Sequence, residues 1–277
     1  MNTRLRLKAL LGLLVLLVCL NAKLTMAAPF GELISFWDDR EEGSSFVVDH
    51  SRWQGILDKY LDDEHVSGIN LFDYDSVTDD DEKILIEYLQ YLQSFEPRQF
   101  NSNEQKAYWI NLYNALTVAV ILDRGSDIES IRDIRSGVFT RGPWQLDLAK
   151  IVTQDLSLDD IEHGILRPIW KDNRIHYAVN CASISCPNLL KTAFTGANIE
   201  ELLNKAARDY VNHERGVKIE NGKLTLSSIY DWYSEDFGSG VPDLIIHLRQ
   251  YAEPQLASQL QVFTQADFDY NWDLNAP

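Results

Sequence analysis

The sequence predicts an α+β fold in which a mostly helical body surrounds a small, mainly antiparallel sheet. Apolar residues recur at helical spacing in several long segments, most clearly in the first half of the chain. Strand signals are short and lie mainly in the second half, where residues 217–226 (VKIENGKLTL) carry an Asn-Gly pair typical of a hairpin turn. With 277 residues, of which 45% are hydrophobic, the chain can bury one sizeable core.

Residues 1–27 have the pattern of a secretory signal peptide that is cleaved. Arg4, Arg6 and Lys8 precede an apolar run at 9–20, and small residues follow it. No other stretch approaches the roughly 20 apolar residues that a membrane-spanning helix requires. We therefore expect a periplasmic or secreted protein that has no transmembrane span after cleavage.

The chain is strongly acidic, with 25 Lys and Arg against 42 Asp and Glu and a net charge of −17. The expected signal peptide holds four of the basic residues and none of the acidic ones, so its removal makes the protein more acidic still. An acidic protein without a basic cluster repels phosphate backbones, which excludes nucleic acid as a partner. The remaining partner classes are an envelope protein, a peptide or a small molecule.

After the signal, residues 28–100 are expected to form a helical segment packed on a main domain at 101–277. Ser51 and Asp79 each precede apolar residues at helical spacing and are expected to cap helices. The acidic run at 78–82 coincides with the start of the second helix, where the helix dipole favours carboxylates. The spaced oxygen ligands and turning glycine of a calcium loop are missing, so we expect no metal and no cofactor.

Residues 104–123 are apolar on nearly all sides, which predicts a buried helix. Ser102 with Gln105 has the pattern of a capping box at its start, and a glycine follows its end. Within this helix Asn111 and Asn114 lie three residues apart and therefore share a face. Buried amides need hydrogen-bond partners. These two either tie the helix to neighbouring backbone or orient a ligand or a catalytic group.

The segment that follows combines extended structure with a second, more polar helix. Residues 138–152 show an alternating pattern around an Arg-Gly-Pro turn, which favours extended structure. Ser157, with an acid three residues on, is expected to cap a helix that Pro168 ends. Glu162 and His163 lie on this helix, close in sequence to two cysteines.

Residues 174–189 (RIHYAVNCASISCPNL) concentrate the reactive side chains of the chain. The run up to Asn180 alternates bulky apolar residues with others and is predicted to be a strand, with His176 and Asn180 on one face. Cys181 follows the strand, and small polar residues form a loop that returns to Cys186. A pair of thiols is thus expected at a strand end.

The rest of the chain predicts helices and short strands. The expected elements are a helix from Asn198 to His213, the hairpin at 217–226, a short helix starting at Ser227 or Ser228, a last helix beginning near Pro242 and a closing strand at 268–275. The sheet of the predicted fold contains the hairpin and the strand of His176.

Five motifs together resemble one known family. They are WINLYNALTV (109–118), IEHGILR (161–167), RIHYAVNCASISCP (174–187), IYDWYSEDFG (229–238) and YNWDLN (270–275). In this order, over roughly residues 107–275, they resemble the family called domain of unknown function 547, and this resemblance implies no established activity. A buried helix followed by a histidine-bearing strand is also similar to transglutaminase-like papain folds. Those folds place a cysteine at the helix start, where this chain has Lys106 and Ala107, so a shared fold would need a relocated nucleophile.

Four interpretations of the two cysteines remain open from the residues alone. Cys181 and Cys186 can form a structural disulfide, which export to an oxidising compartment favours. One of them can be a nucleophile with His176 or His163 as its base. The pair can be a redox couple, although the usual CxxC spacing is absent. The two histidines and two cysteines can also bind zinc, although the interval between the cysteines is long.

Two hypotheses for the function follow from these interpretations. The first is a cysteine-dependent hydrolase or acyl transferase of the cell envelope, with Cys181 as nucleophile, His176 or His163 as base, and Glu162 and Asn180 orienting them. The second is a noncatalytic envelope binding module in which the cysteines form a disulfide. The number of reactive thiols separates the two hypotheses, because only a nucleophile must remain a free thiol.

Overall fold

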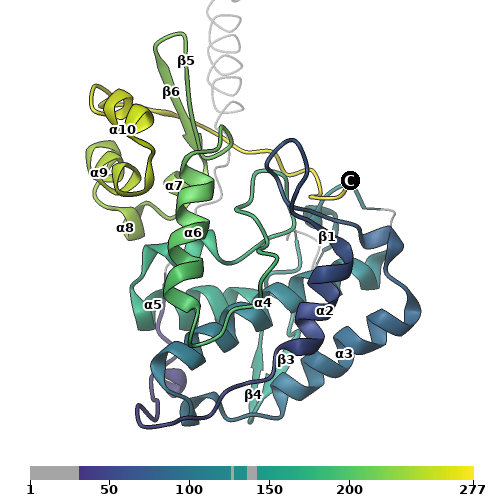
Figure 1. Ribbon diagram of the computed structural model, residues 1–277. Helices are drawn as coiled ribbons and strands as arrows, with labels where there is room; N and C mark the ends of the chain where they lie inside the picture. Colours follow the sequence, from purple (N-terminus) through teal and green to yellow (C-terminus); the bar gives the residue numbers. More distant parts are fainter. Residues whose placement is uncertain (1–30, 126–127, 136–141) are drawn as a thin grey trace, which may run out of the picture.

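The computed structural model describes residues 31–125, 128–135 and 142–277 (Figure 1). Its helices surround a long central helix, and its strands form small sheets of two or three strands, so the predicted α+β class is confirmed. The expected signal peptide at 1–27 lies outside the described residues. Within the part of the chain that the structure describes, no helix has the length and apolar character needed to cross a membrane.

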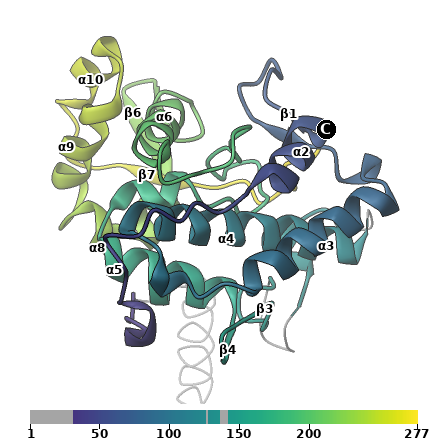
Figure 2. The same cartoon turned by 60° about the horizontal axis from the view of Figure 1, so that its bottom comes forward.

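The central helix is α4, Ser102–Arg124, and its side chains are buried over most of its length because the helix is apolar all round. α2 (Ser51–Tyr60) and α3 (Asp79–Gln93) lie on one side of it, and α6 (Ile199–Val211) lies on another, with α9 (Val241–Tyr251) beyond α6 (Figures 1 and 2). α4 is therefore the common support for both halves of the chain.

The start of α4 corrects the predicted capping box. The cap is Asn101, whose side chain accepts the N–H of Glu104 at 3.1 Å. Ser102 instead accepts a hydrogen bond from the indole of Trp170, and Gln105 donates to the carbonyl of Asp39. Both predicted capping residues are used in tertiary contacts, which a local pattern cannot reveal.

The N-terminal segment adds several short elements to α2 and α3. They are η2 (Ser35–Trp37), the antiparallel pair β1 (Leu61–Asp62) and β2 (Leu71–Phe72), η3 (Tyr74–Ser76) and η4 (Pro97–Gln99). The cap of α3 is Thr78, whose hydroxyl accepts the N–H of Asp81, so Asp79 is the first helical residue rather than the cap. Ser51 is likewise the first residue of α2 and makes no capping hydrogen bond. The acids at the start of α3 lie in its first turn, as the helix dipole favours.

After α4 come η5 (Ile131–Asp133), then β3 (Ala149–Ile151) and β4 (Gln154–Leu156), which pair antiparallel. Only part of the predicted extended region at 138–152 lies in the described residues, and β3 falls within that part. The predicted capping box of the next helix is present. Ser157 and Asp160 exchange hydrogen bonds through their side chains and backbone N–H groups at 2.9 and 3.1 Å.

The prediction that Pro168 ends this helix is wrong. The helix contains a π-helical stretch, η6 (Asp160–Leu166), and continues through α5 (Arg167–Trp170). Proline has no N–H, so the carbonyl of Gly164, four residues earlier, lacks its usual partner. The N–H of Ile34 binds that carbonyl at 2.9 Å and supplies the missing hydrogen bond.

The predicted strand of His176 is also wrong. Residues Asn173–Tyr177 form a 3-10 helix, η7, capped by Asp172, whose side chain accepts the N–H of Arg174. An irregular stretch follows η7 and contains the cysteines. The sheet that was expected to include His176 therefore contains only C-terminal strands.

In that sheet the hairpin is confirmed, with β5 (Val217–Glu220) antiparallel to β6 (Lys223–Ser227). The turn residues Asn221 and Gly222 have φ of 52° and 75°, as a two-residue hairpin turn requires. The predicted closing strand is shorter than expected: β7 is Asp267–Asp269 and lies parallel to β6. The tail beyond it meets the cysteine loop in an isolated bridge between Ser183 and Leu274.

The remaining helices partly match the prediction. They are α6, α7 (Ile229–Trp232), α8 (Ser234–Phe237), α9 and α10 (Pro254–Leu260). Ser228 precedes α7 and Pro242 lies in the first turn of α9, as expected. Asn198 starts α6 without a capping bond, because its side chain contacts Thr195 and Ala193 instead, and α10 was not predicted.

α9 is joined to η7 through the buried imidazole of His247. Its Nε2 lies 2.7 Å from the hydroxyl of Tyr177, and its Nδ1 lies 3.1 Å from Nδ2 of Asn173. The amide nitrogen can only donate, so Nδ1 accepts and the ring is neutral. Burial, helped by the nearby His176, lowers the pKa of His247 to about 4.

We expect His247 to reduce the stability of the protein in mild acid. Because its pKa is lowered from 6.5 to about 4 in the folded state, its contribution is complete above pH 6.5 and is lost as the pH falls toward 4. Between pH 7 and pH 5 this loss is about 1–2 kcal/mol in the free energy of unfolding. Urea unfolding at pH 7 and pH 5 measures this loss. Between these pH values the free energy of unfolding should fall by about 1–2 kcal/mol less in His247→Gln than in the wild type. Equal losses in the two proteins would contradict this account.

Candidate thiol site

The two asparagines of α4 hold the backbone of neighbouring segments. Asn111 donates to the carbonyl of Phe194 at 2.7 Å and accepts the N–H of the same residue at 3.1 Å. Asn114 donates to the carbonyl of Ala178 at 2.9 Å and accepts the N–H of Asn180 at 2.8 Å. Each buried amide therefore acts as a backbone anchor, and Asn114 fixes the start of the cysteine loop.

Asn180, which was expected to orient a catalytic group, instead holds the loop closed. Its Oδ1 accepts the N–H of Ala182 at 2.9 Å, and its Nδ2 donates to the carbonyl of Pro187 at 2.7 Å. The loop is also held at its middle, where the hydroxyl of Tyr210 donates to the carbonyl of Ser185. Hydrogen bonds therefore hold the loop between the two cysteines at both ends and at its middle.

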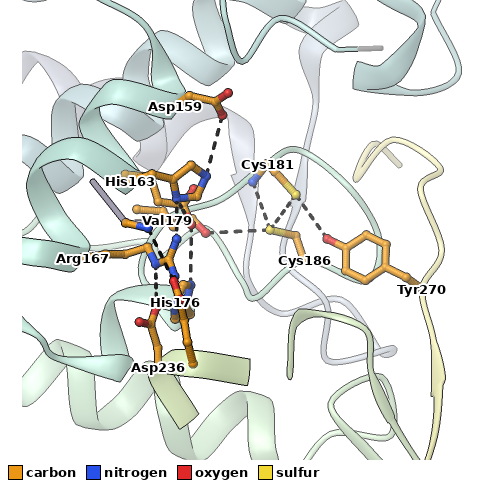
Figure 3. Close-up of polar contacts among 12 residues, drawn as sticks. Asp159, His163, Arg167, His176, Val179, Cys181, Cys186, Asp236 and Tyr270 are labelled. Carbon is orange, nitrogen blue, oxygen red and sulfur yellow. Dashed lines mark hydrogen bonds and ion pairs between the residues drawn. The ribbon is translucent and has the colours of Figure 1, made fainter. Parts of the chain in front are cut away.

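Cys181 and Cys186 lie side by side in this loop as free thiols, so the structure contains no disulfide between them (Figure 3). Their sulfurs are 3.1 Å apart, and the N–H of Cys181 donates to the sulfur of Cys186 at 3.0 Å. The sulfur of Cys181 also lies 3.2 Å from the hydroxyl of Tyr270 and 3.3 Å from that of Ser183. These two hydroxyls are themselves 2.8 Å apart. Three polar groups therefore converge on one sulfur.

The surroundings of the two thiols separate their acidities. The hydrogen bond with Cys186 lowers the pKa of Cys181, and those with Ser183 and Tyr270 add to this effect against burial. Burial raises the pKa of Cys186 well above its ordinary value, and the contact with Cys181 raises it further. Cys181 is therefore the more acidic thiol of the pair, and the thiolate is the reactive form of a cysteine.

Beside the thiols lies a group of ionisable side chains, which we call the charged cluster: the buried Glu162, His163, Arg167 and His176 and the half-buried Asp236. Figure 3 labels all of them except Glu162. The helix at 157–170 supplies the first three, η7 supplies His176, and α8 supplies Asp236. His176 Nε2 and Arg167 Nε each lie 2.6 Å from Oδ2 of Asp236. On its other side, His176 Nδ1 lies 3.6 Å from Oε1 of Glu162.

The cluster shifts the pKa values of its two histidines in opposite directions. Burial alone would lower the pKa of His176, but Asp236 and Glu162 outweigh it and raise that pKa. Burial lowers the pKa of His163, whose Nδ1 lies 3.1 Å from Nη1 of Arg167 and so accepts a hydrogen bond. The two carboxylates therefore favour the protonated form of His176, whereas burial and the contact with Arg167 favour the neutral form of His163.

The structure thus gathers the predicted catalytic residues into two neighbouring groups. Glu162, His163 and His176 meet in the charged cluster, and Cys181 belongs to the thiol pair. Among the contacts of the described residues, no hydrogen bond or ion pair joins Cys181 to either histidine. The sulfur of Cys186 lies 3.8 Å from the carbonyl of Val179, a contact within the cysteine segment itself (Figure 3). A Cys-His pair in direct contact is therefore not what lowers the pKa of this thiol.

The proposed zinc set is likewise divided between the two groups. Over the described ranges, no three His, Cys, Asp or Glu side chains are grouped so that they could hold a metal ion. The two histidines face carboxylates and an arginine, whereas the two sulfurs face hydroxyls and each other.

Three residues of the site were not found from the sequence: Ser183, Asp236 and Tyr270. Asp236 lies in the DFG of the fourth motif, and Tyr270 begins the fifth motif, which was interpreted only as a strand. For Asp236 and Tyr270, the signal available in the sequence was their place in two motifs that follow the cysteine motif. The contacts join residues 60 and 89 positions apart, so no local spacing could assign the roles.

The fold and site define an α+β domain in which a buried central helix holds a dithiol loop beside a buried ionic cluster. Residues 97–211 match the family model described as "Protein of unknown function, DUF547", so this segment is similar to that family. The matched range runs from η4 to the end of α6 and includes both cysteines, whereas Asp236 and Tyr270 lie beyond it. No curated protein and no solved structure matches the chain.

Proposed function

We propose that this protein is a cysteine-dependent hydrolase or acyl transferase in which Cys181 is the nucleophile. The observation that carries the proposal is the set of polar groups around its sulfur, from Cys186, Ser183 and Tyr270. Groups that donate hydrogen bonds to a thiolate stabilise it and lower its pKa, and the thiolate is the form that attacks. Cys181 is half-buried whereas Cys186 is buried, so Cys181 is the more accessible of the two cysteines.

In this proposal the Cys181 thiolate attacks the carbonyl carbon of an ester, thioester or amide. The leaving group departs with its electron pair and takes a proton from solvent, and the resulting thioester passes its acyl group to water or to another acceptor. Asp236 and Glu162 raise the pKa of His176 and favour its protonated form, so His176 is the poorer candidate for the base. His163 is the neutral histidine and hence the better candidate for the base.

Location in the cell envelope is a second part of the proposal. It rests on the charged start, apolar run and small residues at 1–27, which are typical of a cleaved secretory signal. An enzyme exported in this way would meet acyl groups of envelope peptides, proteins or small molecules. The chain's net charge of −17 favours neutral or cationic substrates over anionic ones.

The proposal is tested by the reactivity of Cys181. In the reduced protein, the rate of alkylation by iodoacetamide should reach half its maximum below a pH of about 8.5, the ordinary value for a cysteine. Tyr270→Phe and Ser183→Ala should each move this midpoint upward, because each removes a hydroxyl that stabilises the thiolate. Ser258→Ala, at an exposed hydroxyl on α10, is the control and should leave the midpoint unchanged. If the alkylation midpoint of the wild type lay at about pH 8.5, Cys181 would not be an activated nucleophile.

A noncatalytic envelope binding module is the second candidate function. The observation that favours it is an open pocket of about 500 Å³ that lies away from the thiols. Its walls come from residues 47–54 and 192–198. The side chain of Gln54 joins the two segments by accepting the N–H of Ala193, and Asn111 ties Phe194 to α4. If Cys181 proves to be an ordinary thiol, binding of a peptide or small molecule at this pocket becomes the better explanation.

A further inference from the structure

The cysteine loop keeps its two sulfurs at a short separation. They lie 3.1 Å apart, and the N–H of Cys181 donates to the sulfur of Cys186. A disulfide bond is about 2.05 Å long, so the sulfurs need to approach by only about 1 Å to bond. Rotation about the side-chain bonds can supply this movement.

The backbone of the loop is already arranged for such a bond. Asn180 connects Ala182 to Pro187 across the loop, and Tyr210 holds the carbonyl of Ser185. Because these hydrogen bonds fix the loop before any covalent bond forms, closing it costs little additional conformational entropy. The pairing of the two thiols is thus built into the folded state.

The two thiols differ in access to a reagent. Cys181 is half-buried, whereas Cys186 is 4% exposed and packs beneath it. A soluble reagent can therefore reach Cys181 first, and Cys186 can reach only what is bound at Cys181. The lowered pKa of Cys181 and the raised pKa of Cys186 favour the same order of reaction.

We propose that Cys181 and Cys186 are a thiol–disulfide exchange couple that reacts with low-molecular-weight disulfides. The Cys181 thiolate attacks one sulfur of the small disulfide, forms a mixed disulfide and releases one small thiol. Cys186 then loses its proton to the departing sulfur, attacks the sulfur of Cys181 and displaces the second small thiol. The protein gives up two electrons and two protons as the Cys181–Cys186 bond forms, and the small disulfide takes them up as two thiols.

This inference deepens the proposed function and rests on it in one respect, since the same thiol serves both. A bond to Cys186 would occupy Cys181 and stop acyl transfer until a reductant restored the thiol. The two proposals nevertheless fail separately. An alkylation profile with an ordinary thiol pKa would contradict the proposal that Cys181 is an activated nucleophile. A mixed disulfide that persists at Cys181 would contradict only the proposal of an exchange couple.

The experiment treats the reduced wild type, Cys186→Ser and Cys181→Ser with oxidised glutathione and follows the intact mass. The wild type should lose the mass of two hydrogen atoms without retaining glutathione, and dithiothreitol should reverse the change. Cys186→Ser should accumulate one glutathione on Cys181, because the thiol that resolves the mixed disulfide is absent. Cys181→Ser should remain unmodified, because Cys186 is buried.

Two outcomes would overturn the inference. One is a wild type that keeps glutathione as stably as Cys186→Ser does, and the other is a Cys181→Ser variant that reacts as fast as the wild type. Circular dichroism of each variant shows whether it is folded. If a variant is unfolded, peptide mapping of the oxidised wild type still decides the question, because it shows directly whether Cys181 is joined to Cys186 or to glutathione.

Discussion

Arg167→Met is expected to lower the free energy of unfolding by about 3–5 kcal/mol, the cost typical of removing one partner from a buried ion pair. The guanidinium lies in the charged cluster with its side chain 3% exposed. Its Nε lies 2.6 Å from Asp236, and its Nη2 lies 2.6 Å from Glu235. Without Arg167, the Glu162 and Asp236 carboxylates would share only His176 as a close positive charge in the cluster.

Urea unfolding at neutral pH measures this effect, and Arg40→Met provides the matched control. Arg40 forms its ion pair with Glu42 at the surface, where the two side chains are 34% and 65% exposed. Pairs of this kind contribute about 0–1 kcal/mol. If the two variants lost similar amounts of stability, the charged cluster would not be the strong contact between the helix at 157–170 and α8 that the structure describes.

Asn114→Leu is expected to cost about 2–5 kcal/mol in the free energy of unfolding. It leaves two buried backbone groups unpaired, the carbonyl of Ala178 and the N–H of Asn180, at about 1–3 kcal/mol each. Leucine has a similar size, so little of this loss comes from packing. The loop would also lose its anchor at the end nearest Cys181.

Asn111→Leu separates the effect on stability from the effect on the site. Asn111 makes the same pair of hydrogen bonds, but with Phe194, which lies outside the cysteine loop. Both variants should melt at lower temperature than the wild type, whereas only Asn114→Leu should alter the alkylation rate of Cys181. Unchanged melting in both variants would show that the amides do not anchor these segments.

The elements predicted correctly are those whose signals lie within a few residues of each other. The hairpin follows from Asn221-Gly222 between alternating residues, and the box of Ser157 and Asp160 starts its helix as expected. The burial of α4 follows from its apolar composition on all sides. From the same composition it follows that Asn111 and Asn114 need partners, although the sequence does not identify those partners.

The errors arise where tertiary contacts override a local pattern. Every residue from Ile175 to Asn180 is buried, so the alternation that suggested a strand does not separate an inner face from an outer one. Pro168 does not end its helix because Ile34, far away in sequence, supplies a hydrogen bond to Gly164. The charge state of His176 likewise depends on Asp236, 60 positions later, so the sequence could suggest a histidine site but not its ionisation.

The position of Asp236 also shows that the site extends beyond the segment that matches the family. The segment that matches the family ends at residue 211, yet His176 and Arg167, both within it, bind the carboxylate of Asp236, and Cys181 contacts Tyr270. Cutting the chain at the family boundary would remove the carboxylate that contacts His176 and Arg167 and the hydroxyl that contacts the sulfur of Cys181. The matched segment is therefore not a self-sufficient unit, and a transplanted copy would need a C-terminal extension that supplies equivalents of α8 and the tail.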